Sequence, residues 1–220
     1  MKLIHFSLAA ALMTCLLTFC NGQNSNSNEQ AAPGKNQVVG GGCDGCELMY
    51  AGMPGSIDWT DTSAGWNETG SRLLLTGTIF KKDKETPASN VILYYYHTDN
   101  NGLYSPGENM NEVAKRHGHL RGWVKTNEQG KYMIYTIRPA SYPNSDNAAH
   151  IHVSIKEPGI ANEYYIDELV FDDDPLLTAS KRKNLENRGG NGVLKLTTKN
   201  GILVADHDII LGLNIPGYPE

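Results

Sequence analysis

The motif His150-Ile151-His152 places two imidazoles two residues apart in an apolar stretch that is typical of a β-strand. Alternation along a strand sends residues i and i+2 to the same face, so both imidazoles point one way and Ile151 points into apolar packing. Neutral imidazole is a common metal ligand, and a metal ion satisfies two buried histidines at once. The motif therefore predicts a metal site.

Two tyrosines narrow the choice of metal. Tyr142 precedes Pro143, eight residues before His150, and Tyr104 follows the turn Asp-Asn-Asn-Gly at residues 99–102. A phenol has a pKa of about 10 and binds metal well as phenolate, a form that a hard trivalent cation favours at neutral pH. Taken singly, each is better explained as a turn or core tyrosine. Two imidazoles with two phenolates would suit Fe(III) better than zinc.

A second pair, His117-Gly118-His119, precedes another apparent strand. Gly118 leaves its geometry open, and loop histidines that line a cleft or are solvated are commoner than metal ligands. We expect these two histidines to lie outside the ligand set.

The elements that must position these residues are mostly strands, because short β-branched and aromatic runs alternate with turn signals. The sequence predicts a mainly β fold, an antiparallel β-sandwich with one short helix. A hairpin connection at residues 127–130 is expected to join neighbouring strands. The helix is expected at residues 174–187, with Asp174 as its N-cap. The expected strands cover residues 73–80, 91–96, 120–126, 132–137, 149–155, 163–171, 193–198, 202–205 and 208–211.

The N-terminal region is typical of an exported protein. Residues 1–20 are expected to form a signal peptide, in which a basic start precedes an apolar run that ends at Cys20. Residues 21–40 are polar and predict a flexible tether, and residues 41–220 form the folded domain. Cys20 is the expected lipidation site of a bacterial lipoprotein, although Phe19 stands where a small residue is usual. Simple secretion is the alternative.

Cys43 and Cys46 enclose Asp-Gly in this exported chain. In an oxidising compartment a structural disulfide is the favoured interpretation, and a redox-active pair is the alternative.

The bulk charge bears on partners. The formal net charge is −5 and no Lys/Arg cluster forms a stripe, which argues against nucleic acid. We expect membrane contact only through a lipid anchor, and the sequence leaves the oligomeric state open.

Residues 91–171 resemble the catalytic core of the intradiol ring-cleavage dioxygenases, the group that includes protocatechuate and catechol dioxygenases. The resemblance rests on four motifs in matching order and spacing. They are Tyr-x-His-Thr-Asp-Asn-Asn-Gly-Leu-Tyr ending at Tyr104, Leu-Arg-Gly-Trp-Val-Lys-Thr-Asn-Glu-Gln-Gly-Lys-Tyr at residues 120–132, Thr-Ile-Arg-Pro-Ala-Ser-Tyr-Pro at residues 136–143, and His150-Ile-His152.

The resemblance implies that Tyr104, Tyr142, His150 and His152 bind Fe(III). It further implies an enzyme that cleaves a small aromatic diol with O2, between the two hydroxyl-bearing carbons, to a muconate-type product. Tyr142 would leave the metal when the substrate binds and would take a substrate proton.

The chain departs from the family pattern at two positions. Asn147 stands where the family usually has an Arg, and counting to the usual Gln reaches Ile166, or Glu163 with a small gap. We expect Arg138 to substitute for the missing cation, with Arg121 or His119 as alternatives. These departures motivate a second hypothesis, a non-catalytic exported binding module of the same fold, with or without iron. A third is a transthyretin-like β-sandwich without metal.

Overall fold

The computed structural model of this protein describes residues 38–220. The expected signal peptide, the lipidation site Cys20 and tether residues 21–37 lie outside the described residues. Residues 38–40, the end of the expected tether, are described, and Val39 and Gly40 are buried. The backbone N–H of Gly40 donates to the carbonyl of Pro216 at 2.8 Å, which ties this segment to the C-terminal end of the domain.

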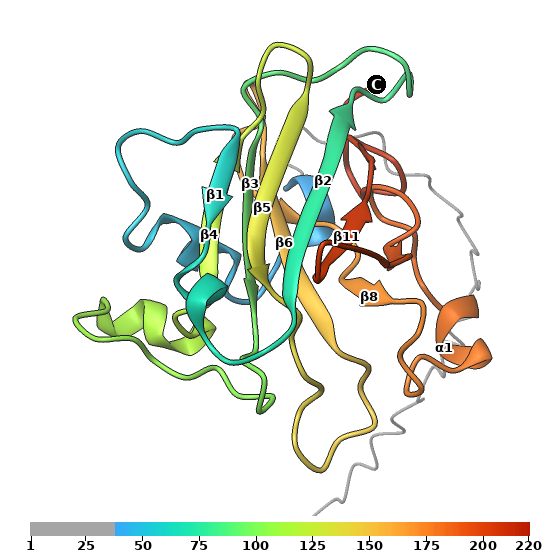
Figure 1. The fold of residues 1–220 in the computed structure, drawn as a ribbon. Helices are drawn as coiled ribbons and strands as arrows, with labels where there is room; N and C mark the ends of the chain where they lie inside the picture. The colour runs from blue at the N-terminus through green and yellow to red at the C-terminus, as the bar shows by residue number, and fades with distance from the viewer. Residues whose placement is uncertain (1–37) are drawn as a thin grey trace, which may run out of the picture. The chain divides into compact units, whose positions relative to one another are not determined.

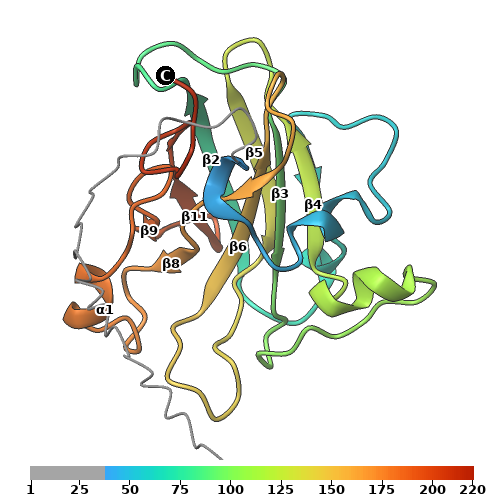
Figure 2. The same ribbon diagram turned by 180° about the vertical axis from the view of Figure 1, so that it is seen from behind.

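The described chain forms two six-stranded sheets that lie face to face (Figures 1 and 2). The first contains, in spatial order, β1 (Thr60–Thr62), β5 (Lys131–Ile137), β2 (Arg72–Phe80), β11 (Ile202–Asp206) and β10 (Thr197–Lys199), with β12 (Ile209–Ile210) paired to β2. The second contains β4 (Arg121–Lys125), β3 (Ile92–His97), β6 (His150–Lys156), β8 (Leu169–Phe171) and β9 (Val193–Leu194), with β7 (Tyr164–Tyr165) paired to β6. The expected mainly β sandwich is confirmed.

The strand pairing differs from the expectation in two respects. The sheets are mixed, because β1–β5, β2–β11, β2–β12 and β8–β9 are parallel pairs. The predicted hairpin at residues 127–130 is wrong, since β4 pairs with β3 in the second sheet and β5 pairs with β2 in the first. Asn127 does form a tight turn, and its side-chain oxygen accepts from the N–H groups of Gln129 and Lys131. Such a turn reverses the chain locally, but it does not decide whether the two flanking strands pair. Here the packing of the two sheets against each other places β4 in one sheet and β5 in the other.

The core lies between the sheets and follows the alternation of the strands. On β6, Ile151, Val153 and Ile155 are buried among the core side chains of both sheets. His150 and His152 therefore point to the outer face of the second sheet, as their spacing predicts. The register of β3 against β6 places Tyr96 opposite His152 on that same face.

The helical content is smaller than the sequence predicts. The α-helix α1 covers only Ala179–Lys183, and its cap is Thr178, whose hydroxyl accepts from the N–H of Lys181 at 3.3 Å. Asp174 instead accepts hydrogen bonds from the N–H groups of Ala149 and Leu176, so its carboxylate anchors the start of β6 rather than a helix. Four short 3-10 helices complete the set in the described part of the chain: η1 (Val39–Gly41), η2 (Cys46–Tyr50), η3 (Ala64–Asn67) and η4 (Glu112–His117). Within residues 38–220, none of the helices has the length and apolar character needed to span a membrane.

Candidate metal centre

Strand β6 supplies two imidazoles whose tautomers are set by their neighbours. Nδ1 of His150 lies 2.7 Å from the carbonyl oxygen of Ala148, and Nδ1 of His152 lies 3.2 Å from a carboxylate oxygen of Glu168. Because both of these partners accept hydrogen bonds, each Nδ1 carries the proton. The Nε2 lone pairs of both rings are therefore free to bind a metal.

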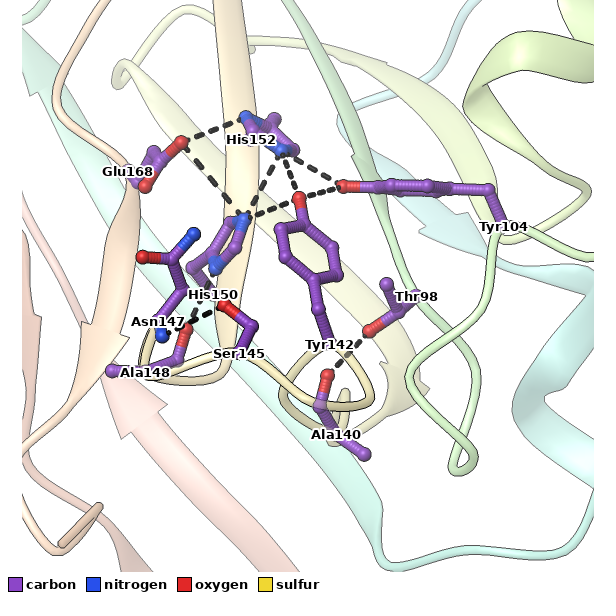
Figure 3. A network of polar contacts seen from close by, with 10 residues as sticks. All are labelled: Thr98, Tyr104, Ala140, Tyr142, Ser145, Asn147, Ala148, His150, His152 and Glu168. Carbon is purple, nitrogen blue, oxygen red and sulfur yellow. Dashed lines mark hydrogen bonds and ion pairs between the residues drawn. The ribbon is translucent and has the colours of Figure 1, made fainter. Parts of the chain in front are cut away.

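Four donor atoms converge at this point (Figure 3). The hydroxyl of Tyr142 lies 2.7 Å from that of Tyr104, 2.9 Å from Nε2 of His150 and 3.4 Å from Nε2 of His152. Nε2 of His152 lies 2.9 Å from the Tyr104 hydroxyl and 3.2 Å from Nε2 of His150. The structure thus brings together all four ligands predicted from the sequence.

The two loops that carry the tyrosines are held together by the side chain and the backbone carbonyl of Asp99. Oδ1 of Asp99 accepts from the N–H groups of Asn101 and Leu103, and its Oδ2 accepts from the hydroxyl of Ser105. These bonds shape the turn that ends at Tyr104. The carbonyl of Asp99 accepts from the N–H of Ala140, two residues before Tyr142. Asp99 therefore fixes both tyrosine loops relative to each other.

Burial favours the uncharged forms of His152, Tyr104 and Tyr142 by shifting the pKa of each. It lowers the pKa of His152 to about 3, and the neighbouring His150 contributes in the same direction. Burial also raises the pKa of Tyr142, and it raises that of Tyr104 far above the usual range, with a further contribution from the hydrogen bond to Tyr142. The site is thus set to accept a positive charge, which would favour both phenolates.

The close approach of the Nε2 atoms of His150 and His152 indicates that the four donors suit a metal ion. The two Nε2 atoms are 3.2 Å apart, yet both are hydrogen-bond acceptors, so no proton lies between them. Facing lone pairs at this distance repel each other, and a cation bound by both removes that repulsion. Metal–nitrogen distances of about 2.0–2.1 Å place ligand atoms about 3 Å apart, in the range of the spacings seen here.

Tyr96 and His117 extend the site as a row of stacked rings. Tyr96 stacks on His152 with ring centroids 4.4 Å apart and on His117 at 3.6 Å, with interplanar angles of 14° and 2°. Nδ1 of His117 is hydrogen-bonded to the hydroxyl of Tyr94 at 2.8 Å. His119 lies elsewhere, where it contacts Glu68 and the carbonyl of Ser105. In the part of the chain that the structure describes, neither His117 nor His119 is hydrogen-bonded to the four donors, and His117 supports His152 through the ring of Tyr96.

A cavity of about 620 Å³ has His152 in its lining, the one residue of the four-donor set that borders it. Its lining includes Tyr96, Tyr165, Ile166, Glu168 and residues 42–46. The volume is in the range of small-molecule sites, so the cavity can hold a small ligand next to His152.

The candidates for a substitute cation have other partners. Both terminal nitrogens of Arg138 bind Asp173, at 2.9 and 2.8 Å, and its guanidinium lies over Phe171. Arg121 donates to the carbonyls of Leu48 and Ala51. Among the residues that line the cavity, all of which are described, there is no Lys or Arg.

The two positions that depart from the family pattern are also placed. Asn147 is exposed and lies in the loop before β6. Ile166 is buried in the core and borders the cavity, whereas Glu163 accepts a hydrogen bond from the hydroxyl of Tyr50 at 2.9 Å. The carboxylate that does reach the histidines is that of Glu168, two residues beyond Ile166.

Glu168 and Tyr96 were not identified from the sequence. Strand alternation gives a partial signal for Tyr96, which shares a face with the outward residues of β3, but its pairing with His152 depends on the register between strands. Glu168 lies just before β8, which pairs with β6 over only two residues, and no local sequence pattern identifies it. Cys43 and Cys46 form a disulfide with their Cα atoms 5.6 Å apart, beside the same cavity.

Comparisons with known proteins agree with this geometry. A sequence model of the family described as Dioxygenase matches residues 51–188. A catechol 1,2-dioxygenase from Acinetobacter baylyi is 33% identical over 95 residues, which cover 43% of this chain and 30% of that protein. The match thus spans less than a third of the length of that curated relative.

Solved structures share the fold at lower identity. The dioxygenase domain of a dioxygenase and carbohydrate-binding protein fusion from Streptomyces sp. SirexAA-E superposes with a TM-score of 0.54 at 21% identity, over 73% of this chain and 96% of that one. A hydroxyquinol 1,2-dioxygenase from Pseudomonas putida DLL-E4 gives a TM-score of 0.51 at 19% identity, over 72% and 62% of the two chains.

The family match covers more than half of the chain and includes Tyr104, Tyr142, His150 and His152. Together with the two-sheet fold and the convergence of these four side chains, it identifies the relationship that the sequence motifs suggest. The chain belongs to the intradiol ring-cleavage dioxygenase family.

Proposed function

We propose that this protein is a non-haem Fe(III) dioxygenase that cleaves catechol-type rings between the two hydroxyl-bearing carbons to give muconate-type products. The observation that carries the proposal is the meeting of two phenol oxygens with two Nε2 lone pairs, at spacings of 2.7–3.4 Å. Two hard anionic oxygens with two imidazoles suit a trivalent cation. Bound iron would supply a Lewis acid that lowers the pKa of the diol and draws electron density from its ring.

The residues of this chain have separate tasks in that proposal. His150 and His152 come from one strand, whose register holds them in place, and their Nδ1 hydrogen bonds keep the Nε2 atoms aimed at the metal. Tyr142 lies on the loop between β5 and β6, and its oxygen contacts all three other donors. Tyr142 is therefore placed to accept a proton from an incoming diol, and Tyr104 remains as the second phenolate.

The test starts from the purified full-length protein. Its iron content and visible absorption are measured first, because phenolate-to-Fe(III) charge transfer gives a visible colour. O2 uptake and muconate formation are then followed with catechol, protocatechuate and hydroxyquinol. Tyr142→Phe should shift the visible band and abolish turnover. Tyr135→Phe is the matched control, since Tyr135 packs edge-to-face against Trp66 and is not one of the four donors. A colourless protein without iron would refute the proposal.

One observation favours a second function, a binding module that retains the metal site without turnover. Asn147 is exposed where a cation is usual, and the guanidinium of Arg138 is already paired with Asp173. A missing positive charge near developing anionic charge costs transition-state stabilisation, typically several kcal/mol. Bound iron and bound catechol without O2 uptake would support this second function.

A further inference from the structure

Residues 42–46 form part of the wall of the cavity that His152 also lines. They line the same cavity as His152, Tyr96 and Glu168. Figure 2 shows this N-terminal segment, in blue, lying across the outer face of the second sheet. The segment forms no strand in either sheet, so side-chain and loop contacts hold it there. We refer to residues 38–51 as the strap.

The strap is anchored at both ends. At the first end, the side-chain nitrogen of Asn162 donates to the carbonyl of Val39 at 2.8 Å, and Arg188 donates to the carbonyl of Gly40 at 3.0 Å. At the second end, the indole N–H of Trp123 donates to the carbonyl of Met49 at 2.7 Å. Met49 is fully buried, so the strap packs into the domain as well as crossing it.

The middle of the strap is a small closed ring. The Cys43–Cys46 disulfide closes a turn that contains Asp44 and Gly45. The hydroxyl of Ser154, on β6, lies 3.5 Å from the sulfur of Cys46. Arg116, from η4, binds both oxygens of Asp44, at 3.3 and 2.5 Å. The turn is therefore closed covalently and is held by β6 on one side and by η4 on the other.

The turn also contacts the row of stacked rings formed by His117, Tyr96 and His152. Gly45 is buried, and a Cβ at this position would lie 3.3 Å from Nε2 of His117. His117 stacks on Tyr96, which stacks on the ligand His152. The turn is thus linked to His152 through His117 and Tyr96, and it lines the same cavity as His152.

We propose that the disulfide-closed turn at residues 43–46 is a specificity-determining wall, which contacts the ring substituent of a bound catechol and sets which substituted catechols fit. This inference rests on the proposed function for the catechol itself. A bare catechol has far fewer atoms than the drug-sized ligands for which cavities of roughly 300–1,000 Å³ are typical, so a cavity of about 620 Å³ leaves room for a substituent.

The test measures binding as well as turnover. The iron-loaded full-length protein is titrated with 4-nitrocatechol, whose own absorbance reports binding, and catechol and 4-tert-butylcatechol compete for the site. Two variants loosen the turn: Cys43→Ser with Cys46→Ser removes the disulfide, and Asp44→Ala removes the pairing with Arg116. Glu112→Ala is the control, because it breaks an exposed pair with Lys115 outside the cavity lining.

Removal of the disulfide should change the ratio of the dissociation constants of 4-tert-butylcatechol and catechol by about tenfold. A difference of one methylene in an apolar pocket has an effect of this size. Asp44→Ala, which leaves the disulfide intact and alters only an exposed residue, should change the ratio in the same direction. Iron content, the visible band and the affinity for bare catechol should stay unchanged. If both variants fold and the ratio of the two dissociation constants is the same as in the wild-type protein, the proposed role of the turn in specificity is wrong. Failure of the wild-type protein to turn over any catechol overturns the proposed reaction instead, and the binding ratio still tests the wall.

Discussion

A carboxylate oxygen of Glu168 lies 3.2 Å from Nδ1 of His152, on the side of the ring away from the two tyrosines (Figure 3). Glu168 comes just before β8, whereas His152 lies on β6, and these two strands are paired. A carboxylate in this position orients an imidazole and makes its Nε2 a stronger ligand. Glu168 therefore does for His152 what the carbonyl of Ala148 does for His150, with an added negative charge.

We expect Glu168→Ala to weaken iron binding by roughly 10–100-fold, the usual effect of losing such a partner. Competition with a chelator, followed through the visible band, gives the affinity. Glu163→Ala is a suitable control because Glu163 contacts Tyr50 and not the histidines. Equal affinities in the two variants would show that Glu168 has no part in metal binding.

The stack of Tyr96 on His152 leads to a second prediction. Tyr96→Phe preserves the ring and should leave the visible band in place. Tyr96→Leu removes the flat surface that restrains the His152 ring at 4.4 Å, and should shift or broaden the band and lower iron affinity. The measurement is the visible spectrum of the iron-loaded variants with melting temperature recorded in parallel. Identical spectra for Phe and Leu would contradict a positioning role for this ring.

The charge around the cavity predicts a preference among substrates. Four acidic residues line it, Asp44, Asp167, Glu168 and Glu186, and no Lys or Arg does. Because like charges repel, protocatechuate should bind about tenfold more weakly than 4-methylcatechol at low salt, and the difference should shrink as salt screens it. Glu186→Gln should narrow the difference, as measured by competition with 4-nitrocatechol. Tighter binding of protocatechuate than of 4-methylcatechol would contradict the predicted effect of these acidic residues.

Buried histidines predict how stability depends on pH in the metal-free protein. Burial lowers the pKa of His207 to about 4, from 6.5. Between these two values the unfolded chain binds the proton and the folded chain does not, so the free energy of unfolding falls as the pH drops through this window. His97 and His117, whose pKa values are also about 4, act in the same direction.

Replacement of His207 by Gln should reduce the slope of that dependence near pH 5 by about 1.4 kcal/mol per pH unit, the value for one proton. Denaturant unfolding at several pH values gives the slope. His119→Gln serves as the comparison, because the hydrogen bonds of His119 with Ser105 and Glu68 outweigh its burial and raise its pKa, so its contribution is lost only above pH 6.5. Parallel slopes for wild type and His207→Gln would refute the prediction.

Much of the candidate site is predictable from the sequence because it depends on short-range geometry. The spacing of His150 and His152 requires only that residues i and i+2 of a strand share a face, which holds for any L-polypeptide. The turn before Tyr104 is likewise local, since the side chain of Asp99 bonds to the backbone of the next few residues.

Other features could not be predicted because they depend on which strands pair. The turn at residues 127–130 has the residues of a hairpin, yet β4 and β5 belong to different sheets. The motif for a helix at residue 174 was also misleading, since the carboxylate of Asp174 bonds the N–H of Ala149 instead of capping a helix. In both cases the local signal is real, and long-range packing selects another use for it.

The sequence by itself determined the four candidate ligand residues, their order along the chain and the shared face of the two histidines. The tertiary structure alone brought Glu168 to His152, stacked Tyr96 and His117 behind it, and laid the disulfide turn of residues 43–46 over the cavity. The physical reason is the range of the forces involved. Backbone geometry orients side chains within a few residues, whereas contacts between distant segments depend on the free energy of packing the whole domain.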